Sequence, residues 1–223
     1  MKPLEVVATL RGGVALPNGP LALDGLVAAA VAIRDGMVRP TGEGDILPIE
    51  IPIQRAHGGR FHLASVGFFE VDASERRWVN RRFPIGEAQQ MGDARLRTAR
   101  INAGPCKSYR LPLATHHAKD DRMTWWCIGD ATGVEELLAL ISYVGKKRST
   151  GNGRVAAWSV REMAVEELWD GFPVLRDGLP LRALPLDWPG LCEDAPRGYS
   201  TITYPYWTRW LEEPLAMPVE AGA

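Results

Sequence analysis

The glycine-rich segment between residues 145 and 153 carries the side chains best suited to binding an anion. It combines three cationic residues with the neutral donors of Ser149, Thr150 and Asn152. Glycine tolerates positive φ and close approach, so the backbone N–H groups of such a loop can turn outward around a phosphate. We therefore predict contacts with the phosphates and riboses of a nucleic-acid backbone. The residues in this prediction are Lys146, Lys147, Arg148, Ser149, Thr150, Gly151, Asn152, Gly153 and Arg154.

The same loop does not match the patterns that bind nucleotides. A Walker loop reads GxxxxGK[ST] and joins a strand to a following helix, whereas here a predicted helix precedes the loop and a predicted strand follows it. No GxGxxG motif follows the first predicted strand, where Arg11-Gly12-Gly13 indicates only a bend. A surface turn that needs glycine for its shape alone is the other interpretation of the loop.

Charge is unevenly distributed along a chain whose formal net charge is only −1. Residues 76–122 carry 11 Lys and Arg against 4 Asp and Glu, and residues 145–161 carry 5 basic residues and no acidic one. These two segments together carry +12, which leaves −13 for the other 159 residues. Two basic segments on an acidic body favour a localised face that binds a polyanion. Solvated charges, each near its own acidic partner, are the alternative.

Composition excludes several classes of protein. The chain has 223 residues, of which 46% are hydrophobic, and its longest apolar run, near residues 26–33, is far shorter than a membrane span of about 20 residues. Glycine and proline make up 40 residues, which favours turns and loops over a helical bundle. The three cysteines, Cys106, Cys127 and Cys192, form no CxxC pair, so we expect a reducing, cytoplasmic setting. No HxH, HExxH or paired-carboxylate signature predicts a metal or other cofactor.

Hydrophobic patterning predicts the elements that would position the loop. We expect a strand over residues 4–10, and a helix capped by Asp24 with Leu26, Ala29, Ala30 and Ile33 on one face. A hairpin follows, with strands over 46–54 and 61–71. Residues 76–122 lack periodicity and are interpreted as an inserted, extended arm or hairpin.

The second half of the pattern repeats the order of the first. A strand is predicted over 124–128, then a helix through Tyr143 that begins with a capping box at Thr132 and Glu135. Val134, Leu137, Leu138 and Ile141 mark its buried face, and a last strand runs over 154–160. The fold class is therefore α+β, close to a ferredoxin-like (RRM-like) β-α-β-β-α-β core with one extra strand beside the insertion. We place this domain at residues 1–161, with the basic arm at 76–122, and a Pro/Trp-rich C-terminal extension at 162–223 that packs on the core.

Two aromatic features call for separate interpretations. Trp125 and Trp126 are adjacent in a predicted strand and so point to opposite faces, which places one in the core. The other is expected to stack on a base or to pack on the C-terminal extension. Tyr109, between Lys107 and Arg110, is the aromatic that we nominate for base stacking.

The loop between residues 145 and 155, placed between a helix and a strand, resembles the glycine-rich loop of the CRISPR-associated RAMP superfamily. The strand that ends in Arg11-Gly12-Gly13, the helix near Leu26 and the basic arm agree with this resemblance. The size of the chain and the stretch over residues 179–186 are most similar to the small subunit that caps the 5′ end of the guide RNA. The whole chain is most similar to the version found in type IV effector complexes.

That resemblance implies an RNA-binding subunit of an antiviral ribonucleoprotein, with a ferredoxin-like body and an inserted thumb at residues 76–110. Its partners would be the repeat-derived 5′ handle of the guide RNA (crRNA), the neighbouring backbone subunit and the large subunit, with no membrane involved. Contact with target DNA beside the protospacer is left open. Besides the loop, the residues expected to bind RNA are Arg11, Arg81, Arg82, Arg95, Arg97, Arg100, Lys107, Tyr109 and Arg110.

Some members of the superfamily cut the guide precursor, which implies an alternative function. His116 and His117 end the basic arm, and Lys107, Tyr109 and Lys119 are near them in sequence. A metal-independent ribonuclease can use such groups as general acid and base beside a 2′-hydroxyl nucleophile. Adjacent histidines that only form surface hydrogen bonds are the other interpretation, and we expect a protein without enzymatic activity.

Overall fold

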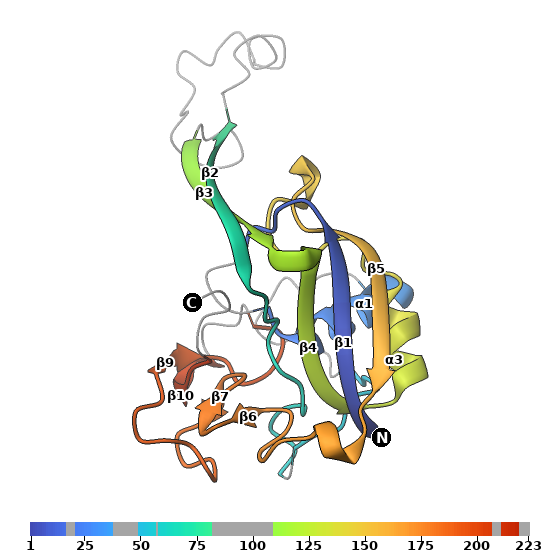
Figure 1. Cartoon of the computed structure of the whole chain (residues 1–223), viewed down its shortest axis with the longest axis vertical. Helices are drawn as coiled ribbons and strands as arrows, with labels where there is room; N and C mark the ends of the chain where they lie inside the picture. Colours follow the sequence, from blue (N-terminus) through green and yellow to red (C-terminus); the bar gives the residue numbers. More distant parts are fainter. Residues whose placement is uncertain (17–20, 38–48, 57, 82–108, 207–210, 219–223) are drawn as a thin grey trace, which may run out of the picture.

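A three-stranded antiparallel sheet of order β4–β1–β5 forms the body of the protein in a computed structural model (Figure 1). The structure describes residues 1–16, 21–37, 49–56, 58–81, 109–206 and 211–218. The strands are β1 (Lys2–Arg11), β4 (Arg122–Gly129) and β5 (Arg154–Glu162), which confirms the three strands predicted there. Side chains of a strand alternate between its faces. Leu4, Val6, Ala8 and Leu10 of β1 are accordingly buried on one face.

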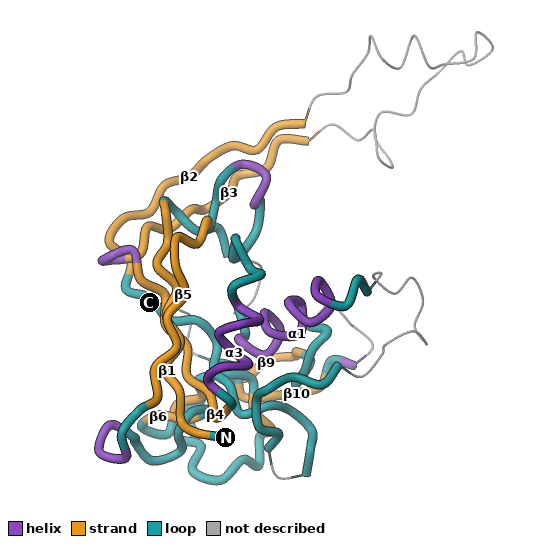
Figure 2. Tube along the Cα trace, turned by 90° about the vertical axis from the view of Figure 1, so that its right-hand side faces the viewer, coloured by secondary structure: helices purple, strands orange, loops and turns teal. Residues whose placement is uncertain are grey.

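Two helices cover that face of the sheet (Figures 1 and 2). They are α1 (Leu23–Arg34) and α3 (Ala131–Leu138). Val27 and Val31 of α1 pack with Val134 and Leu138 of α3, and the core they share includes Trp125. Trp126, on the other side of β4, meets the ring of Trp169 at 5.3 Å between centroids, so it packs on the C-terminal extension. No helix in the described parts of the chain is long and apolar enough to cross a lipid bilayer.

The predicted helix faces and caps are partly wrong. Asp24 does not cap α1: Ala22 precedes the helix, and Asp24 is fully buried inside the first turn. Ile33, expected in the core, is 56% exposed. Nearly every position of α1 is apolar, so the hydrophobic periodicity of its sequence does not single out one face for burial. The burial of Asp24 instead determines how the helix is rotated about its axis.

For α3 the buried face is as predicted, but the ends of the helix differ. Asp130 caps the helix by accepting a hydrogen bond from the Gly133 N–H (2.8 Å), in place of the predicted box at Thr132. The helix ends at Leu138 rather than at Tyr143. Residues 142–144 instead form backbone hydrogen bonds with residues 153–155, from the Val144 N–H (2.8 Å) and the Val155 N–H (2.9 Å).

The strand expected over residues 61–71 is a series of isolated bridges. Ala64 and Phe68 bridge β4 in the antiparallel sense, at Cys127 and Thr124. The Trp126 N–H donates to the Ser65 hydroxyl, and the Ser65 carbonyl accepts from Leu23 instead. The segment is thus shared between β4 and the start of α1, which interrupts the ladder. Of the strand expected over 46–54, residues 46–48 lie outside the described residues, and the rest contributes one bridge, Ile53 to Gly129.

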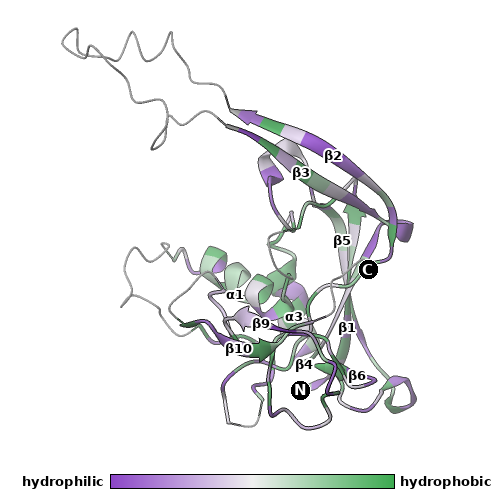
Figure 3. Cartoon of the chain, turned by 90° about the vertical axis from the view of Figure 1, so that its left-hand side faces the viewer, coloured by the Kyte–Doolittle hydropathy of each residue, from purple (hydrophilic) through white to green (hydrophobic). Residues whose placement is uncertain are grey.

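A long antiparallel hairpin, β2 (Val71–Arg81) and β3 (Tyr109–Ala118), projects from the body (Figures 1 and 3). For residues 76–81 and 109–118 it confirms the extended character predicted for the arm, although the hairpin already begins at Val71; residues 82–108 lie outside the described residues. A short 3₁₀ turn, η2 (Lys119–Asp121), connects β3 to β4.

The chain beyond β5 forms short strands around a second core. After the 3₁₀ turn η4 (Val165–Glu167), β6 (Leu175–Arg176) pairs with β7 (Leu179–Pro180). β10 (Glu213–Ala216) lies between β8 (Leu184–Pro185) and β9 (Arg197–Ser200). Phe61 and Ala56 join this second core, so it includes residues from the first half of the chain.

A buried ionic network fastens the C-terminal extension to the helix layer. Arg182 is almost completely buried, with its guanidinium carbon 4.6 Å from the centre of the Phe61 ring. Its Nη1 donates to the carbonyls of His62 and Ala64 and lies 3.4 Å from the Asp24 carboxylate, and its Nη2 donates to the Ile202 carbonyl (2.6 Å). A buried charge is tolerated only when it is paired and hydrogen-bonded, and this one is.

Tyr206 is the remaining member of this ionic network and contacts both Asp24 and Arg182. Its hydroxyl donates to the Asp24 carboxylate, with contacts of 2.7 and 2.9 Å, although part of the residue is exposed. Burial of the hydroxyl beside that carboxylate raises the pKa of Tyr206 well above its usual range.

We expect Tyr206→Phe to lower the free energy of unfolding by about 1–3 kcal/mol, because the buried Asp24 loses its shortest hydrogen bonds. Urea unfolding of the variant and the parent chain measures the difference. Tyr199→Phe is the matched control, since Tyr199 is 75% exposed and should change stability by less than about 0.5 kcal/mol. Equal effects of the two substitutions would contradict the role of the network.

His62 lies beside this network, and it is buried without an ion-pair partner among the described residues. Its ring stacks on Tyr204 with 5.6 Å between centroids. Burial lowers the pKa of His62 from 6.5 to about 4.

Stability should therefore fall as the pH is lowered from 6.5 toward 4. In that window the unfolded chain takes up a proton at residue 62 and the folded chain does not. The free energy of unfolding decreases by up to about 1.4 kcal/mol per pH unit. Urea unfolding between pH 7 and pH 4.5 tests this, with His62→Phe expected to flatten the dependence and His116→Gln, a change outside the core, expected to keep it. The same slope in His62→Phe and the parent chain would show that other groups cause it.

Candidate nucleic-acid interface

The glycine-rich loop is held rigidly at its two ends by the segment that follows β1. The Lys146 N–H donates to the Ala15 carbonyl (2.7 Å), and the Gly153 N–H donates to the Gly13 carbonyl (2.9 Å). Between these anchors the chain makes a single 3₁₀ turn, η3 (Arg148–Thr150). The loop therefore has a defined shape before any ligand binds.

Glycine is required at both anchors of the loop. Gly145 and Gly153 have φ of +78° and +66°, in the left-handed region that glycine favours. A Cβ at residue 153 would collide with the Val144 carbonyl, and one at residue 145 would collide with the Ala15 carbonyl. These glycines allow the loop to lie directly against the body.

The tip of the loop presents its polar groups to solvent. Arg148, Ser149 and Thr150 are exposed. Asn152 instead is only 4% exposed, and its amide donates to the Thr150 hydroxyl (3.1 Å), which itself donates to the Lys147 carbonyl (2.7 Å). Asn152 and the Thr150 hydroxyl thus hold the loop in shape, while Arg148 and Ser149 remain exposed.

Arg11 and Arg154 extend the basic surface beside the loop. They are opposite each other in the β1–β5 pairing, and both are exposed. Among the described residues no carboxylate pairs with Arg11, Arg148 or Arg154. Like charges opposite each other on paired strands are unfavourable, so an anion bound between them would relieve repulsion. We call the surface of Arg11, Arg154 and residues 146–151 the loop surface.

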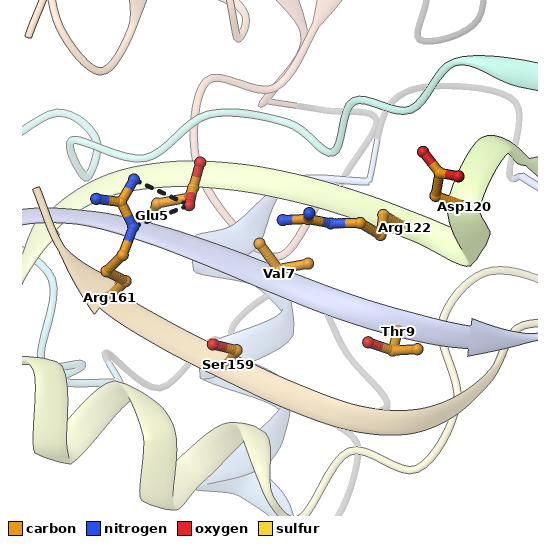
Figure 4. A pocket seen from close by; sticks show the side chains of 7 residues that line it. All are labelled: Glu5, Val7, Thr9, Asp120, Arg122, Ser159 and Arg161. Carbon is orange, nitrogen blue, oxygen red and sulfur yellow. Dashed lines mark hydrogen bonds and ion pairs between the residues drawn. The ribbon is translucent and has the colours of Figure 1, made fainter. Parts of the chain in front are cut away.

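Arg161, counted in the same basic segment of the sequence, does not belong to this surface. It lines a shallow cavity of about 440 Å³ on the face of the sheet away from the helices (Figure 4). There it donates to the carboxylates of Glu5 (3.2 Å) and Glu167 (2.8 Å), and their hydrogen bonds and charges raise the pKa of its guanidinium. Two carboxylates neutralise Arg161, so the open sheet face is mixed in charge.

The base of the hairpin contacts the other side of the segment that anchors the loop. Val14 and His116 exchange backbone hydrogen bonds of 2.8 and 2.9 Å. Gly13 lies against the side chains of Thr115 and His117. The segment over residues 12–15 is therefore packed between the loop surface and the hairpin.

The predicted arm residues that the structure describes lie at the far end of the hairpin from the loop. Arg81 and Tyr109 are paired at the far end of the hairpin. Tyr109 is eight residues from His117 along β3, or about 26 Å at the rise of a strand. The remaining predicted arm residues lie outside the described residues; they are Arg82, Arg95, Arg97, Arg100 and Lys107.

The histidine pair lies at the hairpin base with its two rings on opposite faces of β3. His116 Nδ1 is 2.8 Å from the Ser74 hydroxyl, whereas His117 Nε2 is 3.4 Å from the Glu75 carboxylate. Arg77 pairs with the same carboxylate at 2.5 Å, and the hydrogen bonds from Arg77 and His117 lower the pKa of Glu75. Lys119 pairs with Glu70 at 2.9 Å. The groups proposed for cleavage are thus dispersed.

Comparison with known families identifies the chain. The family model described as CRISPR type IV associated protein Csf3 matches residues 75–217, well over half of the sequence. The chain belongs to the Csf3 family. Csf3 proteins are RAMP-type subunits, so this one is a subunit of a type IV CRISPR complex. A search of curated proteins finds no match.

The match to Csf3 covers the hairpin, the loop, β5 and most of the C-terminal extension. β1 and α1 precede it, yet β1 is paired between β4 and β5. The matched region thus requires the preceding residues for its sheet.

One exposed aromatic residue of this Csf3 protein is not among the residues predicted from the sequence to bind RNA. Trp78 is 50% exposed on β2, and the guanidinium carbon of Arg110 is 4.5 Å from its ring centroid. Its signal was present in the sequence, since Trp78 directly follows Arg76 and Arg77.

The shape of the loop can be tested by comparing two of its glycines. Gly151 also has positive φ (+86°), but a Cβ at residue 151 would meet no other atom nearby. A Cβ at residue 153 would collide with the Val144 carbonyl. We expect Gly151→Ala to lower the free energy of unfolding by about 1–2 kcal/mol and Gly153→Ala by clearly more. Thermal and urea unfolding measure both. Similar losses for the two variants would mean that the close approach of residue 153 to the Val144 carbonyl does not matter for stability.

Proposed function

We propose that this Csf3 protein binds the guide RNA (crRNA) of a type IV CRISPR effector complex and caps its repeat-derived 5′ handle. The loop surface carries the proposal. It joins the exposed Ser149, a preformed backbone turn and three arginines that have no carboxylate partner among the described residues, and such groups contact phosphates and riboses. In RNA-guided complexes base pairing reads the sequence, and the protein holds the RNA by its backbone and shape.

We infer that the body is a ferredoxin-like (RRM-like) core. Residues 62–68 bridge β4 on the side away from β1, which gives the order β5, β1, β4 and then this segment, all antiparallel to their neighbours. α1 and α3 make the two crossovers that a β-α-β-β-α-β unit requires. The hairpin is then the insertion, and residues 162–223 form an extension with its own small core.

The proposed complex places two protein partners beside this chain, the neighbouring backbone subunit and the large subunit. Family membership supports partner subunits in general. Target DNA beside the protospacer is a further proposed contact, and a DNA arm of the binding experiment below addresses it.

We propose that the protein holds the RNA without cutting it. Acid–base cleavage by two histidines needs both rings near one scissile phosphate. The rings of His116 and His117 instead face opposite sides of β3 and bond to Ser74 and Glu75. A guide-processing ribonuclease is the alternative that the experiment below tests.

Removing two cations of the loop surface should weaken RNA binding. We expect Arg148→Ala/Arg154→Ala to reduce affinity for a repeat-containing guide RNA about tenfold or more at moderate salt. Each lost phosphate contact lowers the slope of log K against log[salt] by about 0.7–1, so the slope should fall by about 1.5–2. Filter binding across a salt series gives both quantities, with scrambled RNA and a DNA duplex of target sequence as competitors.

Arg34→Ala/Arg197→Ala is the matched control, because it removes the same charge at sites away from the loop. Equal affinity and slope in the two double variants would overturn the proposed role of the loop surface. The same mixtures on a denaturing gel test cleavage. A discrete cut at the repeat that disappears in His117→Ala would replace the capping proposal with the ribonuclease.

A further inference from the structure

Trp78 and Arg110 form a preassembled flat surface on the projecting hairpin. The guanidinium of Arg110 lies 4.5 Å from the centre of the Trp78 ring, so it covers one face of the indole. Half of the Trp78 surface is exposed, and no other described aromatic ring stacks on it. The hairpin that carries this ring projects from the body (Figure 3), and Trp78 belongs to neither hydrophobic core.

The two faces of the hairpin differ in charge. Residues opposite each other in an antiparallel pair share a face, so the pairing of Trp78 with Pro112 fixes which residues accompany the ring. Asp72 of β2 lies outside the regular pairing, at the irregularity between Val71 and Ala73. From residue 74 to residue 80 of β2, and opposite them on β3, the residues of this face include no carboxylate. They are Ser74, Arg76, Trp78, Asn80, Arg110, Pro112, Ala114 and His116.

The opposite face carries the carboxylate of the hairpin's paired region. Glu75 lies there with Arg77 and His117, and both contact it. The charge of Arg77 is therefore compensated within the hairpin. Arg76, on the Trp78 face, is exposed and has no ion-pair partner among the described residues.

We propose that Trp78 is a stacking site for an unpaired base of a single-stranded nucleic acid, with Arg76 and Arg110 beside it to neutralise the flanking phosphates. The base stacks on the indole face that Arg110 leaves open. Aromatic side chains in basic surroundings bind single strands in this way because every base offers a π-face. A paired base is already stacked in its helix, so the site selects unpaired nucleotides.

This site rests on the proposed function, and it extends the interface beyond the loop surface. Pro112, the partner of Trp78, is four residues from His116, which bridges Val14 beside the loop. That separation is about 13 Å at the rise of a strand. One RNA strand held by the loop surface therefore continues along the face that carries Trp78.

The test uses the full chain and two fluorescent RNA oligonucleotides of equal length, one of uridines and one with abasic sites at its central positions. We expect the parent chain to bind the uridine RNA several-fold more tightly than the abasic RNA. Trp78→Ala should weaken binding of the uridine RNA about tenfold, which is what the loss of one stacked base costs, and should leave binding of the abasic RNA unchanged. Trp78→Phe should restore most of the affinity.

Leu111→Ala is the matched control on the opposite face of the same hairpin, where Leu111 is 53% exposed. It should leave both affinities unchanged. Equal binding of the two RNAs by the parent chain would overturn the proposal even if the Trp78 variants failed to fold. If Trp78→Ala reduced the affinity for both RNAs by the same factor, the proposal would also be overturned, because the contribution of the ring would then not depend on a stacked base.

The proposed loop surface and the proposed stacking site are distinguished by their variants' effects on the two RNAs. Arg148→Ala/Arg154→Ala should weaken both oligonucleotides alike, because it removes contacts to phosphates. An effect of Trp78→Ala specific to bases, without any effect of the loop variant, would support the stacking site and contradict the proposed loop surface. The reverse result would support the loop surface and overturn the stacking site.

Discussion

The burial of the Arg182 guanidinium is the constraint on which the arrangement of the chain depends. A charge in the interior is costly unless its donors are satisfied. Here the partners are carbonyls of His62, Ala64 and Ile202 together with the carboxylate of Asp24. These groups come from the start of α1, the bridged segment beside β4 and the C-terminal extension. None of the three can move away without leaving a buried donor or carboxylate unpaired, so the extension and the sheet form one body.

The short segment over residues 12–15 has a comparable role for the proposed interface. Its carbonyls at Gly13 and Ala15 anchor both ends of the glycine-rich loop, and Val14 bridges the base of the hairpin. A displacement of this segment would move the loop and the hairpin together. The loop surface and the face that carries Trp78 are thus held in a fixed relation by backbone hydrogen bonds, which depend little on the side chains that contact a ligand.

Alternation along β2 and β3 separates the hairpin into two chemically distinct faces. Glu75 compensates Arg77 on one face, whereas the other, from residue 74 to residue 80 and opposite them on β3, carries Trp78, Arg76 and Arg110 without a carboxylate. The same alternation directs His116 and His117 to opposite sides. The proposal that the protein holds a strand without cutting it uses both consequences: the cations and the aromatic ring share one face, and the two imidazoles are apart.

Several features of this protein were determined by the sequence alone, because they follow from local chemistry. Short runs rich in β-branched and other apolar residues were sufficient for β1, β4 and β5, and glycines with cations were sufficient to locate the loop between α3 and β5. Other features depend on segments far apart in the chain. The rotation of α1 follows from the pairing of Asp24 with Arg182 and Tyr206. The interruption of the strand over 61–71 follows from the hydrogen bonds that Ser65 shares with two elements.

The surroundings of single side chains also depend on the tertiary structure. In the sequence Arg161 counts as a free charge, but in the structure it is neutralised by Glu5 and Glu167. Trp78 is exposed, although tryptophan is usually mostly buried. Periodicity and composition describe neighbours along the chain, but burial and charge pairing are set by neighbours in space, which only the tertiary structure brings together.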